Sequence, residues 1–80
     1  MERDSALVRV REVVARTFEK EMQDISESDS YVEDLEADSL DLVELVMAFE
    51  DEFDVSIAED DIAGIKTVRD TVDFVLSHAD

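Results

Sequence analysis

The sequence contains no cysteine and no proline, and it has one glycine and one histidine among 80 residues. Without cysteine, the chain can form neither a disulfide framework nor a thiolate metal site. A single histidine and the lack of a glycine-rich loop leave little for nucleophilic catalysis or for cradling a phosphate group. We therefore expect a protein that is not an enzyme and has no metal site.

Long apolar runs are missing as well. No stretch approaches the roughly 18 apolar residues of a membrane-spanning helix. The first four residues include three charged ones, whereas a signal peptide has an apolar block near its start. We expect a cytoplasmic protein without a membrane span, although a transit peptide that had been removed would leave no trace.

Positive charge is absent from the middle of the chain, and the formal net charge is −17. All seven lysines and arginines lie in residues 1–20 and 66–80, where seven acidic residues balance them, whereas residues 21–65 hold 17 acidic residues. Such a segment repels nucleic acid and attracts basic protein surfaces in a salt-dependent way. A strongly acidic surface also promotes solubility, and composition leaves both explanations open.

Hydrophobic residues make up 45% of the chain, enough for one core. Their spacing predicts helices over residues 5–19, 39–53 and 59–63 and from residue 67 onward. We expect an all-α fold, a small four-helix bundle with three longer helices and one short one, in a single domain over residues 1–80. The long acidic loop over residues 20–38 is expected to be anchored by Ile25, Tyr31 and Leu35, and loops of this length are usually functional.

The helix that begins near Ser39 carries two apolar faces. Asp38 or Ser39 can cap its start, and Asp41 completes an acidic version of a capping box. One face is a stripe typical of a helix that packs on a core, formed by Leu42, Leu45, Val46, Phe49 and Phe53.

The second apolar face lies about 100–160° away around the helix. It consists of Leu40, Val43 and Met47, with Glu44 and Asp51 beside them. Either a neighbouring helix covers these residues, or they form a strip that is open to partners.

The acidic residues around Ser39 do not follow the pattern of a calcium-binding loop. Counted from Asp34, the sixth position is Ser39 instead of glycine, and the twelfth is Leu45 instead of glutamate. Weak, nonspecific binding of divalent cations is all that this pattern allows.

Residues 33–53 resemble the acyl carrier proteins of fatty-acid synthesis, and the resemblance continues through Ile57, residues 65–68 and the last helix. It implies that a transferase attaches 4′-phosphopantetheine from coenzyme A to Ser39. The thiol of that arm would carry growing acyl chains as thioesters between fatty-acid synthesis enzymes. Ser39 would then be a modification acceptor and not a catalyst.

The resemblance also implies a docking surface for the transferase and for synthesis enzymes with basic patches, and a space that shelters acyl chains; a monomer is expected. The docking residues would be Asp38, Leu40, Asp41, Val43, Glu44, Met47, Glu50 and Asp51. The acyl-chain pocket would be lined by Leu45, Val46, Ile57, Ile62 and Ala63.

Three residues depart from the family pattern. Glu36 and Glu19 stand where glycine is usual, and Ala58 where proline is common. We expect the turn at Glu36 to form without glycine's freedom, and the first helix to run on toward Met22. Two alternatives stay open: a carrier for another acyl pathway, such as polyketide or lipid A synthesis, and an acidic interaction module without a prosthetic group.

Overall fold

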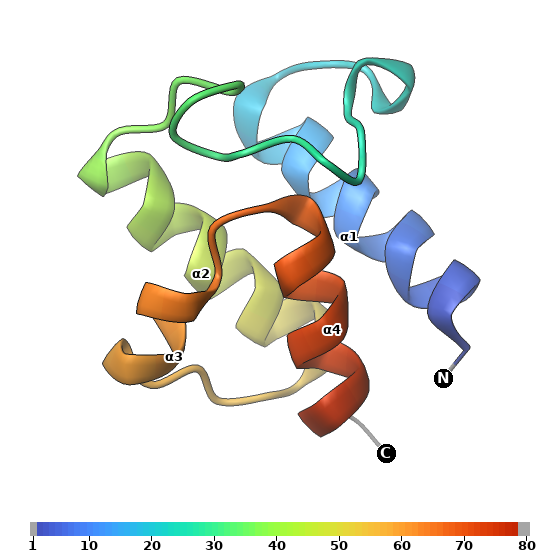
Figure 1. Cartoon of the computed structure of the whole chain (residues 1–80), viewed down its shortest axis with the longest axis vertical. Helices are drawn as coiled ribbons and strands as arrows, with labels where there is room; N and C mark the ends of the chain where they lie inside the picture. Colours follow the sequence, from blue (N-terminus) through green and yellow to red (C-terminus); the bar gives the residue numbers. More distant parts are fainter. Residues whose placement is uncertain (1, 79–80) are drawn as a thin grey trace.

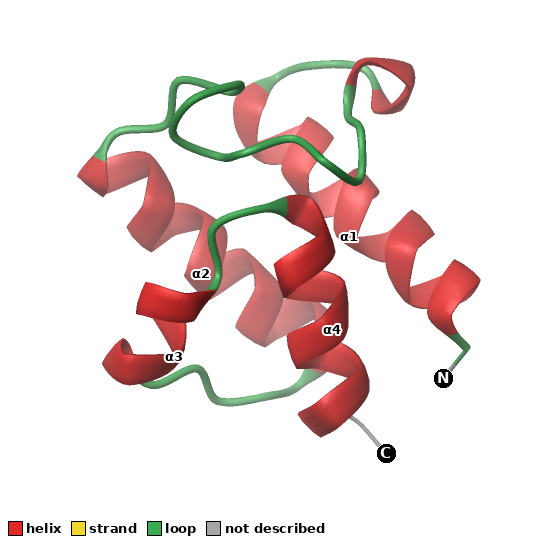
Figure 2. Ribbon diagram, viewed as in Figure 1, coloured by secondary structure: helices red, strands yellow, loops and turns green. Residues whose placement is uncertain are grey.

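The computed structural model describes residues 2–78. Its elements are the helices α1 (Arg3–Phe18), α2 (Ser39–Phe53), α3 (Glu59–Gly64) and α4 (Val68–His78), with a 3₁₀ turn η1 (Met22–Asp24). Helix α1 packs against both α2 and α4, and the long loop crosses one end of the bundle (Figures 1 and 2). The expected all-α bundle of three longer helices and one short helix is confirmed.

The core forms where the apolar stripes of the three longer helices meet. Its fully buried side chains include Val10, Val13 and Val14 of α1, Leu45 and Phe49 of α2, and Val68, Val72 and Val75 of α4. The three loop anchors are buried too, since Ile25, Tyr31 and Leu35 are at most 8% exposed. Among the helices of residues 2–78, none has the length and apolar character needed to cross a membrane.

Helix α1 ends at Phe18, so the expected extension toward Met22 is wrong. Glu19 adopts a left-handed conformation with φ of 55°, and its N–H donates to the carbonyl of Ala15. Glu36 is left-handed as well, with φ of 56°. Both residues make the turns expected of glycine, although this conformation costs a residue with a Cβ roughly 1–2 kcal/mol.

The loop over residues 20–38 is fastened to α1 at one end. The guanidinium group of Arg11 donates to the carbonyls of Ile25 (2.9 Å) and Met22 (2.7 Å). Further along, an isolated β-bridge pairs Ser30 with Thr67, just before α4. These bonds satisfy main-chain groups that would otherwise need water, and they hold the loop against the bundle.

A buried hydrogen bond and an ion-pair cluster reinforce the attachment of the loop to α4. The hydroxyl groups of Tyr31 and Thr71 lie 2.5 Å apart in the core. Glu27 forms ion pairs with Arg3 and with Arg69. Desolvation acts to raise the pKa of the Glu27 carboxyl, but the two guanidinium groups outweigh it and hold that pKa below its usual value.

Candidate functional site

The start of α2 is built by two aspartates that cap each other's main chain. Asp38 Oδ1 accepts the N–H of Asp41 (2.9 Å), and Asp41 Oδ2 accepts the N–H of Asp38 (3.2 Å). The capping box is confirmed, and Asp38 is the N-cap. Ser39 is therefore the first helical residue, and its side chain is not needed for capping. It is exposed, and within residues 2–78 its hydroxyl group has no hydrogen-bond partner.

Two opposing electrostatic effects act on a phosphate group attached at Ser39. The free N–H groups at a helix N-terminus stabilise an anion by roughly 0.3–1 kcal/mol. The carboxylates of Asp38 and Asp41 repel one. Because both carboxylates are helix caps, their presence here has a structural explanation that does not require a partner.

The second apolar face of α2 is open. Leu40, Val43 and Met47 are 69%, 54% and 59% exposed. Glu44 and Asp51 beside them are exposed as well. No helix of the described chain covers this face, which excludes the neighbouring-helix explanation. We call Leu40, Val43, Met47, Glu44 and Asp51 the open face of α2.

Glu50, the remaining acidic residue expected at the docking surface, has a structural role. Its Oε2 accepts the N–H of Ile57 at 2.9 Å, so the carboxylate ties the end of α2 to the link that leads to α3. Its side chain is half-buried. We therefore leave Glu50 out of the open face.

The residues expected to line an acyl-chain pocket are spread over different environments. Leu45 and Ile57 are buried in the core, Val46 and Ile62 are half-buried, and Ala63 is exposed. A cavity of about 300 Å³ shares only Ile62 with this set. We call it the loop cavity; it is lined by Ser30, Tyr31, Val32, Glu33, Leu42, Ile62, Ile65 and Lys66.

Sequence reasoning missed the loop cavity because its walls come from three separate segments. They are the loop, α2, and the end of α3 with the link to α4. The family-like run of residues 65–68 was the one available signal.

Burial raises the pKa of the Tyr31 hydroxyl far above its usual range. Tyr31 therefore stays protonated and serves as an anchor.

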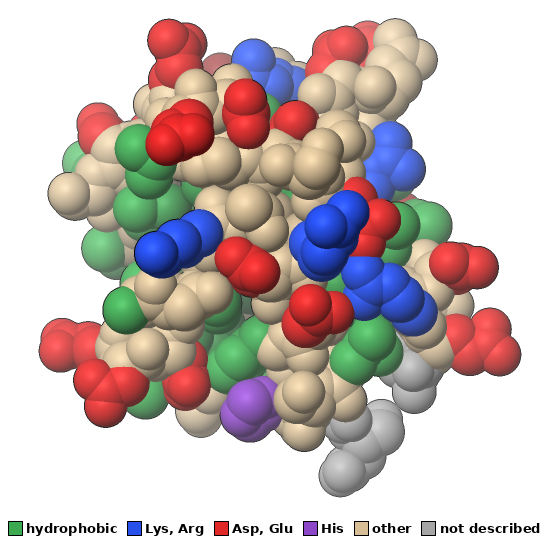
Figure 3. Space-filling view, in the orientation of Figure 1, with side chains coloured by type: hydrophobic (Ala, Val, Ile, Leu, Met, Phe, Trp, Pro, Cys, Tyr) green, Lys and Arg blue, Asp and Glu red, His purple; other side chains and the backbone are tan. Residues whose placement is uncertain are grey.

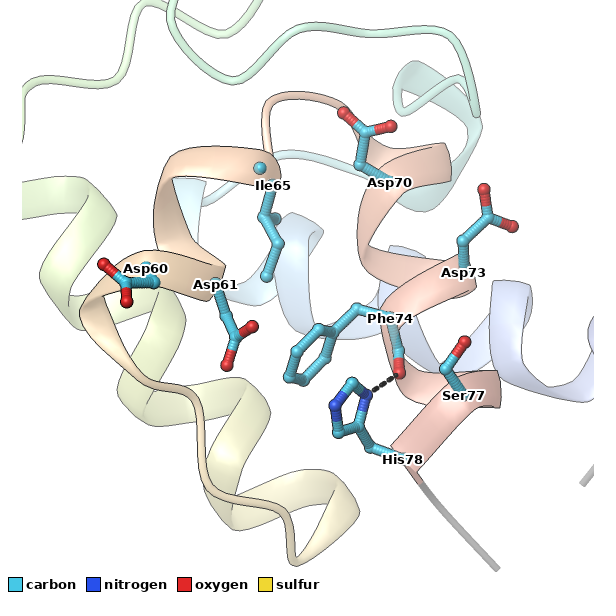
Figure 4. A pocket seen from close by; sticks show the side chains of 9 residues that line it. Asp60, Asp61, Ile65, Asp70, Asp73, Phe74, Ser77 and His78 are labelled. Atoms are coloured by element: carbon cyan, nitrogen blue, oxygen red, sulfur yellow. Dashed lines mark hydrogen bonds between the residues drawn. The ribbon is translucent and has the colours of Figure 1, made fainter.

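A second hollow, of about 370 Å³, lies between α3 and α4 (Figure 4). The His78 ring stacks on Phe74 with centroids 4.0 Å apart, and its Nδ1 lies 2.9 Å from the Phe74 carbonyl oxygen. The carboxylates that line this hollow belong to Asp60, Asp61, Asp70 and Asp73. Its lining residues come from α3, Ile65 and α4, and none of them belongs to α2. No group of histidine or carboxylate side chains in residues 2–78 is arranged to hold a metal ion.

Charge is unevenly distributed over the surface. On the face shown in Figure 3, acidic side chains gather over the loop and over α3, and basic ones occupy the middle of the view. The acidic side chains therefore extend over the parts of the molecule that flank α2 in the sequence.

Residues 8–75 match the family model described as a phosphopantetheine attachment site. The chain belongs to the acyl carrier protein family. The acyl carrier protein of Caulobacter vibrioides is 48% identical to it over 69 residues, which cover 86% of this chain and 88% of that protein. The cofactor of this carrier is accordingly phosphopantetheine, and the protein carries acyl groups and is not an enzyme. The exposed, unpartnered hydroxyl group at the start of α2 fits such an attachment.

Proposed function

We propose that Ser39 is the residue to which 4′-phosphopantetheine is attached. The observation that carries the proposal is that Asp38, and not Ser39, caps α2. This leaves an exposed hydroxyl group at a helix N-terminus. Ser39 Oγ bonds to the phosphorus of the arm, the pyrophosphate bond of coenzyme A breaks, and adenosine 3′,5′-bisphosphate leaves. The serine proton passes to a base of the transferase.

The thiol of the attached arm then carries growing acyl chains between the enzymes of fatty-acid synthesis. The likeness of residues 33–53 to carriers of that pathway supports this assignment. The proposal includes a cytoplasmic location, because coenzyme A donates the arm inside cells.

The open face of α2 serves as the docking surface in this proposal. It combines three exposed apolar side chains with two exposed carboxylates, and it begins at Leu40, the residue after Ser39. Apolar contacts of this kind supply affinity, and the charges attract basic enzymes. Asp38 and Asp41 add charge at the edge of this surface while they cap the helix.

Acyl chains are sheltered between α2 and α3 in the same proposal. The loop cavity supports this idea, because it is mostly apolar and includes Leu42 and Ile62. Leu45, Val46, Ile57 and Ala63 lie outside its lining. In this proposal these four residues contact the acyl group only when a longer acyl chain separates α2 from α3.

The test is an intact-mass measurement. The purified protein is incubated with coenzyme A and a phosphopantetheinyl transferase, and one arm should be added per chain. Ser39→Ala should abolish the addition, whereas Ser56→Ala, at another exposed serine, should leave it unchanged. Modification of the Ser39→Ala variant, or an arm mapped to another serine in the wild type, contradicts the proposal.

A further inference from the structure

Lys66 places a positive charge at the loop cavity. It is the one basic residue in the lining. Its main chain is held on both sides, since its N–H donates to Asp70 Oδ2 (3.0 Å) and its carbonyl accepts the N–H of Tyr31 (3.1 Å). The side chain is exposed and forms no ion pair with the carboxylates of residues 2–78. A fixed backbone therefore presents an unpaired ammonium group beside an apolar cavity.

This charge stands out against the segment that carries Ser39. Residues 21–65 contain 17 acidic residues and no basic one. An anionic group on an arm attached to Ser39 is therefore repelled along this whole segment. The β-bridge between Ser30 and Thr67 places the neighbouring Lys66 beside this acidic loop.

The cavity is within reach of the attachment point. Leu42 lines it and follows Ser39 by three residues, which is about 4.5 Å along a helix axis. An arm that folds back along α2 thus meets the cavity within one turn of the helix.

The polar groups of the lining restrict what the cavity can favour. The hydroxyl of Tyr31 is occupied by Thr71 at 2.5 Å. Ser30 Oγ already accepts the N–H of Glu33 at 3.2 Å. The Ser30 hydroxyl can still donate its own proton, but Lys66 is the one cationic donor in the lining for an oxygen of a bound group. The carboxylate of Glu33, also in the lining, opposes it.

We propose that Lys66 is a specificity-determining residue that favours acyl groups ending in a carboxylate. The inference rests on the proposed function, because it requires an acyl arm on Ser39. The carboxylate pairs with the ammonium group of Lys66, and this holds the acyl group against the cavity and shields its thioester from water. Glu33 weakens the pairing, so its neutralisation should strengthen it.

The test compares two acyl groups that differ in terminal charge. A transferase loads the protein from malonyl-coenzyme A or butyryl-coenzyme A, and thioester hydrolysis is followed by intact mass at fixed pH and low salt. The protection factor is the hydrolysis rate of the free acyl-pantetheine divided by the hydrolysis rate of the thioester on the protein. Lys66→Gln should lower the malonyl protection factor about two- to fivefold, the range reached by exposed ion pairs, and leave the butyryl factor unchanged.

Matched variants separate a local effect from a general one. Lys66→Arg should keep the malonyl protection, and Glu33→Gln should raise it. Lys20→Gln removes the same charge from an exposed residue just after α1, outside the cavity lining, and should change neither factor.

Several outcomes overturn the inference: no change in Lys66→Gln, an equal loss for both acyl groups, or the same loss in Lys20→Gln. Each of these leaves the proposed function standing, because the arm was loaded. If the wild type accepts no arm at Ser39, the proposed function fails and the inference falls with it.

Discussion

Truncation of the open face of α2 should slow the reactions with partner enzymes while the fold keeps its stability. Met47 is 59% exposed, whereas Leu45, two residues earlier on the same helix, is 1% exposed. Substitutions of exposed side chains usually change the free energy of unfolding by no more than about 0.5 kcal/mol. Leu45→Ala removes a buried side chain and should cost roughly 2–5 kcal/mol.

Met47→Ala should have a large effect on the rate of arm transfer, in contrast to its small effect on the free energy of unfolding. If Met47 packs against the transferase, Met47→Ala should remove about 1–2 kcal/mol of binding free energy, which corresponds to a roughly 5- to 30-fold lower kcat/KM. The assay combines urea unfolding of each variant with the initial rate of arm transfer from coenzyme A. The substrate concentration is kept well below KM, so that the rate reports kcat/KM.

Charge reversal on the same face adds a salt-dependent test. Glu44→Lys should reduce the transfer rate more strongly at low than at moderate ionic strength, because it introduces repulsion against a basic partner. Glu12→Lys makes the same change at an exposed position of α1 and serves as the control, with a smaller effect.

Two results would refute this reasoning. If Met47→Ala destabilises the fold as much as Leu45→Ala, the side chain is buried in solution. If Met47→Ala and Glu44→Lys both fold and react like the wild type, partners use a different surface. The concentration of acidic residues around Ser39 would then serve solubility.

Four further predictions concern stability. Asp38→Ala should lower the free energy of unfolding by about 0.5–2 kcal/mol in a urea titration, because it removes the N-cap of α2. Tyr31→Phe should cost about 0.5–1.5 kcal/mol, since Thr71 keeps its bond to a main-chain carbonyl, whereas Thr71→Val should cost roughly 1–3 kcal/mol by leaving a buried hydroxyl unpaired; a double-mutant cycle measures the coupling. The pKa of Glu27 is lowered from 4.5 in the folded state, so its contribution to the free energy of unfolding should be complete above pH 4.5 and be lost as the pH falls through the lower folded value. The melting temperature of Glu27→Gln should therefore depend less on pH in this acidic window than that of the wild type. Moderate salt or millimolar magnesium should raise the melting temperature, because the 17 acidic residues of residues 21–65, a segment without a basic residue, repel one another. Screening shortens the range of that repulsion to about 10 Å at 0.1 M salt. A melting temperature that stays flat or falls argues against charge repulsion.

Helix α2 shows how much local sequence can determine. Its apolar residues recur every three or four positions, which places Leu45 and Phe49 on the buried side and Met47 on the other. Its start follows from hydrogen bonds between residues three apart, Asp38 and Asp41. Both signals depend on short separations along the chain, so the sequence was sufficient to predict the helix and its two faces.

Helix ends were harder to predict where they depend on the conformation of a single residue. The sequence has glutamate at 19 and 36, a residue type that rarely adopts positive φ. The structure places both there. An extension of α1 toward Met22 was expected from residue type alone, but the N–H groups of Glu19 and Lys20 both bond to the carbonyl of Ala15 and end the helix.

The sequence by itself determined the fold class and the segregation of charge, because periodicity, capping and composition are local or additive properties. The candidate serine came from the resemblance of residues 33–53 to acyl carrier proteins. Tertiary structure decided that no helix of residues 2–78 covers Met47 and that the Glu50 carboxylate accepts the main-chain N–H of Ile57. It also decided that Lys66 lies beside the loop. Lys66 and Tyr31 are 35 residues apart in the chain. Their pairing depends on how three helices pack together, and no spacing rule along one segment contains that information.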